Sequence, residues 1–523
     1  MAQSTKFLRH LVSSAVLAFT FSLAAAQPLP GEGGVLRAAM QTNPPTLDVM
    51  TNTANATKQA AVYIFESLVA FDANDEVVPV LAEEWIVSDD ELTYTFPLRQ
   101  GITFHNGQPM QAVDVQASLE RFLEVSPRRT SLAAIDEVEA VDDHTIRLHL
   151  SEPLPTLLAN LASYQTFPAV MPADIITGKG IGELETSDFI GTGPYALVEW
   201  QPDQHIRLQR FADYQVDDRF PRSGLAGEKI AYFEEVYLVP VPESGARVAG
   251  VLTGEFDFAE ALPITQYDQL VNDPSVEPVI RLNEWWIVLD FNHHESSWGG
   301  NVHFRRAIQA ALDMEEIMLA VTSGQPDFFE LQPGPFFTGQ PWWSDVGAET
   351  YNQADLDAAR AHLDAANYAG EEIVILTNRD YEWMYRAVLA AADQLENRLD
   401  MNVTVTVLDW PGQRAMEQSE SGWAIAPNGH DYRQDPTGFE SSWTCPAQRK
   451  FLCNEDLDAA FIDGANVSDF ADRFAAYERM QEVLHRDVVT LGTGSYHGLQ
   501  ATGANLAGFE AWNFPLFWGT YRE

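Results

Sequence analysis

The sequence predicts an α/β protein of at least two lobes, and three observations support that prediction. The chain has 523 residues, 46% of them hydrophobic and 11% aromatic, which is enough to build more than one buried core. The first half reads as mixed strand and loop, whereas the second half alternates strand and helix more regularly. The sequence contains neither internal repeats nor a low-complexity linker, which argues against a string of small modules.

The first 26 residues have the pattern of a secretory signal peptide. Lys6 and Arg9 precede an apolar run at residues 11–23, and three alanines ending at Ala26 supply the small residues that a signal peptidase needs. The run is shorter than the roughly 20 apolar residues of a membrane span, and no later segment approaches that length. We therefore expect a soluble mature chain outside the cytoplasm that begins near Gln27. Neither cysteine lies beside the cleavage site, so no lipid anchor is expected.

The net charge of the chain excludes some classes of binding partner. The chain has 31 Lys and Arg against 76 Asp and Glu, a formal net charge of −45. A field of this sign repels phosphate backbones and anionic lipids, so neither nucleic-acid binding nor direct membrane insertion is expected. It also favours neutral, zwitterionic or cationic ligands over strongly acidic ones. Two origins of the acidity stay open: adaptation to concentrated salt, or an ordinary acidic secreted protein.

Several segments alternate or cluster apolar side chains in ways that predict single elements. Residues 93–96 and 144–150 alternate polar and apolar side chains, which is typical of half-buried strands. Glycine and proline mark a turn at residues 191–194. An apolar run at residues 285–292 predicts a strand, and a helix with one apolar face is expected after Asn301. That face consists of Phe304, Ile308, Ala311 and Leu312.

A strand at residues 372–377, a helix at 382–399 and a strand at 402–409 form a predicted βαβ unit. Such crossovers join parallel strands with a right-handed turn in nearly all known cases. The loops after the two strands therefore leave the same edge of the sheet, the edge at which open α/β sheets bind ligands. The helix is expected to bury a stripe of Tyr385, Val388, Leu389, Ala392 and Leu395.

Two side chains in those loops are candidate ligand contacts. Arg379 offers a planar cation suited to a carboxylate, and Trp410 offers a stacking face. From spacing alone, a solvated loop arginine paired to Asp380 is an equally good interpretation of Arg379.

A polar stretch at residues 428–436 adds acidic side chains, whose charge is opposite to that of Arg379. If it faces the same cleft, Asp431 or Asp435 can hold an ammonium group while Arg379 holds a carboxylate, an arrangement that suits a zwitterion. The alternative for Asp435 is structural, because aspartate before proline commonly forms turns.

The chain has two cysteines, Cys445 and Cys453. In an oxidising compartment they are expected to form a disulfide that closes a short loop, worth about 2–3 kcal/mol on the chain-entropy model. A two-cysteine metal site is the alternative, but no histidine lies near them at zinc-ligand spacing. Neither a metal site nor another cofactor is expected.

Common catalytic motifs are absent. The sequence has no HExxH zinc motif, no GxSxG nucleophile elbow, no GxxxxGK phosphate loop and no dinucleotide fingerprint. We therefore expect a binding protein and no enzyme. A secreted peptidase or glycosidase stays as a remote alternative, which would need Asp431 and Asp435 to point into one cleft about 5–9 Å apart.

Several blocks together resemble the extracytoplasmic solute-binding proteins of peptide/nickel-type ABC transporters, the family of dipeptide-, oligopeptide- and nickel-binding proteins. Any one block is weak, whereas the ordered set is highly specific and covers nearly the whole mature chain. The most recognisable block is FPLRQGITFHNGQPMQAVDV at residues 96–115. The others are residues 43–48, 81–85, 191–195, 291–292 and 305–308, and the pair Cys445 and Cys453.

The resemblance implies a two-lobed periplasmic-binding-protein fold with the ligand cleft between the lobes. Lobe I would be discontinuous, consisting of residues 27–278, which include an extra subdomain, and a return segment at residues 490–523. Residues 279–489 would form lobe II. Two crossover strands near residues 279–287 and 488–495 would form the hinge.

The resemblance also assigns site residues. Arg379 falls where dipeptide binders place the arginine for the ligand carboxylate, and Trp410 resembles a site-lining aromatic. Asp431 lies near the acid that binds the ligand ammonium, but one residue farther from the following Asp-Pro pair than the pattern expects. Tyr432 or Arg433 can occupy that position instead. The expected contacts from the facing lobe are Gln41, Thr42 and Asn43.

The function implied is capture of a short peptide or peptide-like zwitterion in the periplasm, followed by lobe closure and delivery to an ABC permease in the membrane. The binding protein itself is expected to be a monomer. The alternative keeps the class and changes the ligand to an oligosaccharide, an opine-like conjugate or a metal chelate. Aromatic side chains and neutral amides in the cleft would favour a sugar, whereas opposed Arg and Asp would favour a zwitterion.

Overall fold

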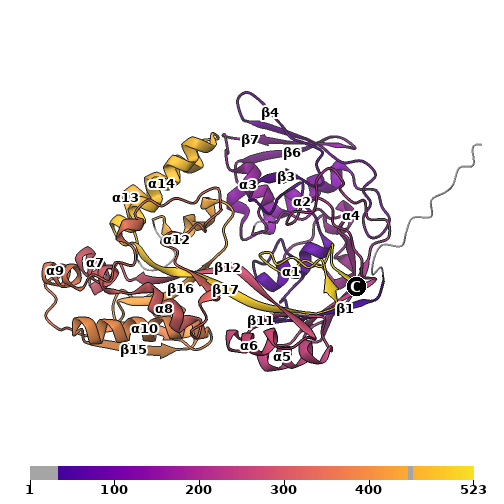
Figure 1. The fold of residues 1–523 in the computed structure, drawn as a ribbon. Helices are drawn as coiled ribbons and strands as arrows, with labels where there is room; N and C mark the ends of the chain where they lie inside the picture. The colour runs from indigo at the N-terminus through magenta and orange to yellow at the C-terminus, as the bar shows by residue number, and fades with distance from the viewer. Residues whose placement is uncertain (1–32, 166, 446–450) are drawn as a thin grey trace, which may run out of the picture.

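Two lobes joined by one continuous sheet make up the molecule (Figure 1). The computed structural model describes residues 33–165, 167–445 and 451–523, so the predicted signal peptide lies outside the described residues. Most of lobe I comes from the first half of the chain, coloured indigo to magenta in Figure 1, and lobe II comes mainly from the orange part. The predicted two-lobed α/β fold is confirmed.

The main sheet passes through both lobes and places lobe II strands at one end and lobe I strands at the other. Its strand order is β15 (Val403–Leu408), β14 (Ile373–Asn378), β16 (Ile425–Asp431), β12 (Val276–Phe291), β17 (Thr490–Gly503), β11 (Phe258–Leu262), β1 (Val35–Met40), β10 (Glu235–Pro240), β9 (His205–Arg210) and β8 (Tyr195–Gln201), with β13 (Phe329–Glu330) paired to β17.

The two long strands β12 and β17 connect the lobes. They pair antiparallel over most of their length, but the register shifts between Arg281 and Trp285, where Asn283 has a left-handed φ of 54°. This bulge takes residues 282–284 out of the regular ladder at the boundary between the lobes. The predicted hinge segments, residues 279–287 and 488–495, lie in or beside these strands, and their role as a hinge stays a prediction.

Lobe I carries an extra subdomain with its own sheet. Its strand order is β4 (Ile86–Val87), β5 (Thr93–Pro97), β7 (Thr145–Leu150) and β6 (Ile135–Asp142), so the predicted strands at 93–96 and 144–150 are confirmed. The alternating burial of β7 reproduces its alternating sequence, since one face packs on the core and the other is more exposed. The helices and short strands of lobe I are α1 (Asn55–Ile64), β2 (Val69–Phe71), β3 (Val77–Pro79), α2 (Ala112–Val125), α3 (Leu157–Ala162), α4 (Ala173–Ile176), α5 (Ser244–Thr253) and α6 (Tyr267–Val271).

The predicted turn at residues 191–194 has a steric reason. A Cβ atom at Gly191 would lie 2.1 Å from the carbonyl oxygen of Ile64, and one at Gly193 would lie 2.5 Å from that of Tyr63. Both contacts are far inside van der Waals distance, so this turn reaches the carboxyl end of α1 only with glycine at these positions.

The predicted βαβ unit in lobe II is confirmed. α10 (Glu382–Leu399) connects β14 to β15, and the two strands are parallel with Ile373 opposite Val403. Val388, Ala392 and Leu395 are buried as predicted, but Leu389 is 42% exposed, so its place in the buried stripe was wrong. The helix turns Met384, Ala387 and Ala391 toward the core instead.

The two largest of the five hydrophobic cores among the described residues lie one in lobe I and its subdomain and one in lobe II. The predicted helix after Asn301 is confirmed as α7 (Val302–Ala311). The Asn301 side chain accepts hydrogen bonds from the backbone N–H groups of His303 and Phe304 in its first turn. The other helices of lobe II are α8 (Met314–Val321), α9 (Leu356–Ala366), α11 (Trp410–Met416), α12 (Glu440–Trp443), α13 (Glu455–Ala465) and α14 (Phe470–Arg486).

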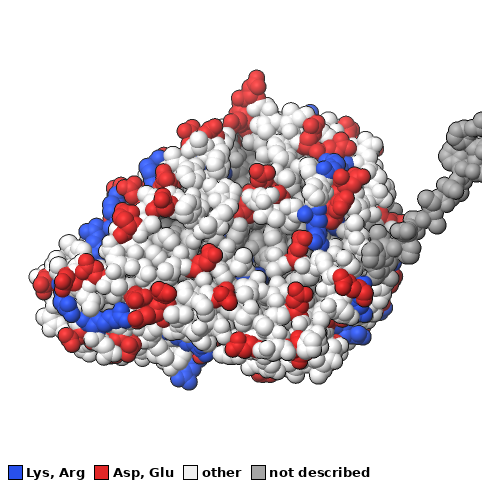
Figure 2. All heavy atoms as spheres, viewed as in Figure 1, with Lys and Arg blue, Asp and Glu red and all other residues white. Residues whose placement is uncertain are grey.

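Helices long and apolar enough to cross a membrane do not occur among the described residues. The face shown in Figure 2 carries acidic side chains over both lobes, with lysine and arginine in fewer places.

Candidate functional site

A cavity lies between the lobes, at the bulge of β12 and the ends of β1, β11 and β16. It encloses about 850 Å³ of empty space, counting the part open to solvent. Lobe I supplies the loop after β1, the first turn of α1 and the end of β11, while lobe II supplies the end of β16. The charged or aromatic residues that border it are Tyr164, Glu260, Arg281, Glu284, Trp285, Asp431, Tyr432 and Phe514, and the amides are Gln41, Asn55, Gln59, Asn283, Gln500 and Asn513.

Four predicted site residues border this cavity. Gln41 and Thr42 come from lobe I and face Asp431 and Tyr432 from lobe II. Asn43 borders a smaller neighbouring cavity together with Thr42. The structure thus brings the predicted segments of both lobes to one place, as a ligand between them would require.

Arg379 and Trp410 border neither of these two cavities. Arg379 is exposed and packs over the ring of Tyr385 at 4.8 Å, donating a hydrogen bond to its hydroxyl. Trp410 begins α11, where the sequence predicted a loop, and its backbone N–H donates to the carboxylate of Asp380 at 2.6 Å. Asp380 therefore contacts the start of α11, and Arg379 pairs with a tyrosine instead of with Asp380. Their predicted ligand contacts stay predictions.

A strip of aromatic rings connects Trp410 to the cavity. Trp285 borders the cavity and stacks on Trp383 with ring centres 6.1 Å apart, and Tyr381 contacts both Trp383 and Trp410. The strip passes over β16 at Gly429, where a Cβ atom would lie 2.7 Å from the Trp383 ring. Larger residues at this position would displace Trp383, so glycine is what allows the ring to lie against the strand.

The carboxylate of Asp431 is already paired within the protein. Arg433 holds one of its oxygens at 2.6 Å, and the side-chain amide of Gln165 in lobe I donates to the other at 2.9 Å. Gln165 in turn accepts a 2.6 Å hydrogen bond from the ammonium of Lys58 on α1. Because a protonated lysine only donates, this contact fixes the amide so that its NH₂ group points to Asp431. A continuous polar chain thus crosses from lobe I to lobe II.

Lys58 is one of the most deeply buried charged residues of the chain, with 2% of its surface exposed. Burial lowers the pKa of its ammonium from 10.5 to about 7. Asp431 raises that pKa and the nearby Arg433 and Arg128 lower it, but neither effect outweighs burial. The charge of Lys58 is therefore sensitive to pH close to neutrality.

Glu260 has a different environment. It is 6% exposed in the middle of β11 and accepts hydrogen bonds from the backbone N–H of Gln41 at 2.6 Å and the side chain of Gln59 at 3.2 Å. Both donors are neutral. Burial raises the pKa of this carboxyl above its ordinary value, and Arg281 and Arg247 offset only part of that effect.

Arg281 and Glu284 form an ion pair within the β12 bulge. Arg281 also donates to the backbone carbonyl of Asn513 at 2.9 Å. The Nε–H of Arg281 and the side-chain NH₂ of Asn513 are both buried and lack an acceptor. This end of the cavity therefore has hydrogen-bond donors in excess.

A second direct contact joins the lobes beside the cavity. The hydroxyl of Tyr432 donates to Asp75 of lobe I at 2.6 Å, and Gln340 donates to the same oxygen at 3.0 Å. Tyr432 stacks on Phe337, which fixes its ring. Tyr164 adds a hydrogen bond from its hydroxyl to the carbonyl oxygen of Tyr432. These bonds hold the lobes together on the side of the extra subdomain.

A second cavity, of about 990 Å³ including solvent-open space, lies on the other side of Tyr164 and Tyr432. Arg433 and Asp435 border it. Asp435 accepts the backbone N–H of Thr437 and pairs with Arg473 at 3.0 Å, which is the structural role proposed for it from the Asp-Pro sequence. Asp431 and Asp435 thus border different cavities, so they do not form the carboxylate pair that a glycosidase would need.

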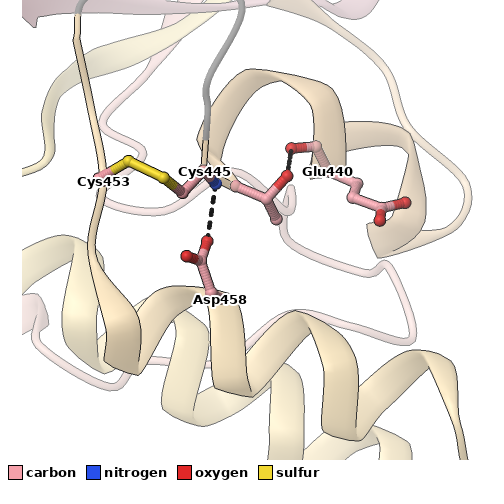
Figure 3. The surroundings of a disulfide bond; sticks show 5 residues. Glu440, Cys445, Cys453 and Asp458 are labelled. Carbon is pink, nitrogen blue, oxygen red and sulfur yellow. Dashed lines mark hydrogen bonds between the residues drawn. A yellow bond between two sulfur atoms is a disulfide. The ribbon is translucent and has the colours of Figure 1, made fainter.

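The predicted disulfide between Cys445 and Cys453 is present (Figure 3). It ties the chain after α12 to the start of α13, and the backbone N–H of Cys445 donates to Asp458 on α13 at 2.9 Å. Glu440 at the start of α12 borders the second cavity, so the disulfide helps to fix one wall of it. The part of the chain that the structure describes contains no cluster of three or more His, Cys, Asp or Glu residues suited to a metal ion.

Sequence reasoning missed Glu260, Arg281, Glu284 and Lys58. Glu260 had a visible signal, since it is the one charge in the apolar strand FAEAL. Lys58 likewise lies on the buried face of α1, where a lysine is unusual. Arg281 and Glu284 had no such signal, because a bulge in a long strand is set by pairing with β17.

The chain belongs to the bacterial extracellular solute-binding proteins, family 5, whose middle region matches residues 76–450. These are periplasmic binding proteins of ABC transporters.

Particular relatives agree with this assignment. The chain is 25% identical to the glutathione-binding protein GsiB of Pectobacterium atrosepticum over 492 residues, 90% of each chain. It is 28% identical to a probable peptide ABC transporter periplasmic-binding protein of Sinorhizobium fredii over 521 residues, 96% of each chain. Among solved structures, the ABC transporter substrate-binding protein CtaP of Listeria monocytogenes superposes with a TM-score of 0.82 at 22% identity, covering 94% of this chain and 99% of that one.

Proposed function

We propose that this protein captures a short peptide or peptide-like zwitterion in the cavity between its lobes and delivers it to an ABC permease. The observation that carries the proposal is a cavity bordered by both lobes and by both signs of charge. Arg281 and the free amide of Asn513 suit a carboxylate, while Glu260, Glu284 and Asp431 provide negative charge for an ammonium. Two relatives, a glutathione-binding protein and a probable peptide-binding protein, support the same ligand class.

Contacts with the ligand are divided between the lobes in this proposal. Gln41 and Thr42 bind it from lobe I, and Asp431 and Tyr432 bind it from lobe II, with Asn43 and Arg433 one layer behind. A ligand too long for the cavity would pass Trp285 and follow the aromatic strip toward Trp410 and Arg379. Arg379 would then bind the far carboxylate, as its sequence position suggests.

The proposed working cycle is that of a binding protein without catalysis. Residues 27–278 with 490–523 form lobe I, residues 279–489 form lobe II, and the chain closes about the β12–β17 crossover. The mature protein begins near Gln27 after signal cleavage, without a lipid anchor, and acts as a monomer in the periplasm.

A thermal-shift screen tests the ligand class. The purified mature chain is heated with glutathione, trialanine, maltotriose or a nickel–histidine chelate, each in large excess. A ligand of the folded state must raise the melting temperature, because at 100 times its Kd it adds about 2.7 kcal/mol to the free energy of unfolding. We expect glutathione or trialanine to do so. A shift with maltotriose or the chelate alone would overturn the zwitterion proposal.

An oligosaccharide is the second candidate, and one observation favours it. The strip Trp285, Trp383, Tyr381 and Trp410 is a run of ring faces next to a cavity with several amides, the combination that sugars use. The maltotriose arm of the screen decides between the two candidates.

A further inference from the structure

We propose that Glu260, and not Asp431, receives the ammonium group of the ligand. This inference rests on the proposed function and names the residue that binds the positively charged end of the zwitterion. It is carried by the different partners of the three carboxylates that border the cavity.

Two of the three carboxylates already have a cation. Asp431 is paired with Arg433, and Glu284 is paired with Arg281. Glu260 forms no ion pair with any lysine, arginine or histidine among the described residues, and its hydrogen bonds come from neutral N–H groups. A ligand ammonium would therefore supply the cation that the Glu260 carboxylate lacks. At Asp431 or Glu284 it would compete with an internal guanidinium.

The burial of Glu260 makes the missing cation significant. Only 6% of the residue is exposed, yet it borders the cavity. A buried carboxylate without a cation is unfavourable, and the raised pKa of Glu260 has the same cause. The groups that face it are the N–H donors Gln41 and Gln59 and the charges of Arg281, Arg247 and Glu284.

Arg247 on α5 holds Glu260 in place without neutralising it. Its guanidinium donates to the backbone carbonyls of Glu260 at 2.8 Å and Ala261 at 2.6 Å, and to two further carbonyls at the start of α5. Ala261 has a left-handed φ of 49°, a conformation that costs energy for alanine and is held by these bonds. The buried Arg247 side chain thus fixes the backbone of Glu260 and does not form an ion pair with the Glu260 carboxylate.

Hydrogen-bond donors that border the same cavity give the ligand a direction. The Nε–H of Arg281 and the side-chain NH₂ of Asn513 donate to no internal acceptor among the described residues and suit the ligand carboxylate. A peptide would therefore lie with its amino end at β11 and its acceptor groups toward the β12 bulge.

Calorimetry with trialanine and N-acetyl-trialanine tests the assignment on the full mature chain. Acetylation removes the positive charge and changes little else. The wild-type protein is expected to bind trialanine at least about tenfold more tightly than its acetylated form. Glu260→Gln is expected to weaken trialanine binding on the order of 100-fold and to bring the ratio near one, because a charged partner is lost from a desolvated site.

Asp431→Asn is the matched control, since it removes a carboxylate that borders the same cavity. Because Asp431 is a proposed ligand contact, this variant is expected to lower the affinity for both peptides by a similar factor and so to keep the preference for the free amine. Loss of the preference in Asp431→Asn, or its persistence in Glu260→Gln, would overturn the assignment to Glu260. If Glu260→Gln does not fold, Glu260→Asp serves instead, which keeps the charge and must keep the preference. A wild-type protein that binds neither trialanine nor glutathione would instead refute the proposed function itself.

Discussion

The two walls of the cavity differ in how their charges are balanced. On the lobe II wall, Asp431 already has Arg433 at 2.6 Å and a lobe I amide at 2.9 Å. On the lobe I wall, Glu260 is buried among neutral donors. The lobe II wall can therefore close on the ligand without needing a charge from it, whereas the lobe I wall is completed by a cation. Both carboxylates border the cavity, and only Glu260 lacks an internal cation among the described residues.

Lys58 provides the largest test, because it links the two walls through Gln165. In the unfolded chain its ammonium keeps the proton up to its usual pKa of 10.5, whereas in the folded protein it loses the proton near a pKa of about 7. Between these values the unfolded state binds more protons, so the free energy of unfolding rises with pH by up to about 1.4 kcal/mol per unit. Below about pH 7 both states are protonated and this dependence ends.

Urea unfolding of wild type and Lys58→Met at pH 6 to 10 measures that effect. The wild type is expected to gain up to about 4 kcal/mol relative to the variant between pH 7 and pH 10. Parallel pH profiles would contradict the lowered pKa of Lys58.

Arg433→Met breaks the balance of the lobe II wall. It leaves Asp431, with a side chain 22% exposed, without its cation, so we expect the free energy of unfolding to fall by about 2–3 kcal/mol. Arg379→Met is the control, because this exposed arginine contacts only a tyrosine ring and hydroxyl among its described interactions and should change stability by less than about 0.5 kcal/mol. Equal losses in the two variants would show that the Asp431–Arg433 pair is unimportant.

The pH dependence of ligand affinity tests the role of Glu260 on the lobe I wall. The ligand ammonium prefers ionised Glu260, whose pKa is raised by burial, so affinity is highest above that pKa and falls as pH decreases through it. The loss is expected to approach about tenfold per pH unit. Calorimetry of trialanine over a series of decreasing pH values measures it, and Glu260→Gln should give a flatter profile. An equally steep profile in Glu260→Gln would assign the titration to another group.

Arg379→Ala is expected to have the smallest effect on binding. Arg379 lies beyond the aromatic strip, so trialanine affinity should change by less than about twofold. A peptide long enough to pass Trp285 should lose severalfold. Calorimetry with trialanine and hexaalanine compares the two, and a large loss for trialanine would place the ligand carboxylate at Arg379 instead of at Arg281.

Most local structure could be predicted because it depends on neighbouring residues. The βαβ unit followed from apolar strands on either side of an amphipathic helix, and α10 begins and ends at the predicted residues, Glu382 and Leu399. Leu389 was wrong because periodicity gives the spacing of a stripe and not its rotation. The small residues Ala387 and Ala391 let α10 pack closely with that face toward the sheet, which leaves Leu389 outside.

The site was predicted only in part. Gln41, Thr42, Asp431 and Tyr432 were found because strand ends and the family resemblance point to them. Arg281 gave no sequence signal, since its position depends on pairing between β12 and β17. Glu260 did stand out as the one charge in an apolar strand, but its lack of an ion pair among the described residues depends on the surrounding tertiary structure. The pairing of β12 with β17 joins residues far apart in sequence, such as Trp285 and Tyr496.

The fold class, the crossover unit, the disulfide and the family could all be predicted from the sequence. Helix and strand periodicity, the number of cysteines and the ordered motif blocks are each visible in short stretches of the chain. The tertiary structure alone decided which charges face the cavity without a partner. The physical reason is that the cost of a buried charge depends on every group around it in space, and for Glu260 those groups come from residues as distant as Gln41 and Arg281.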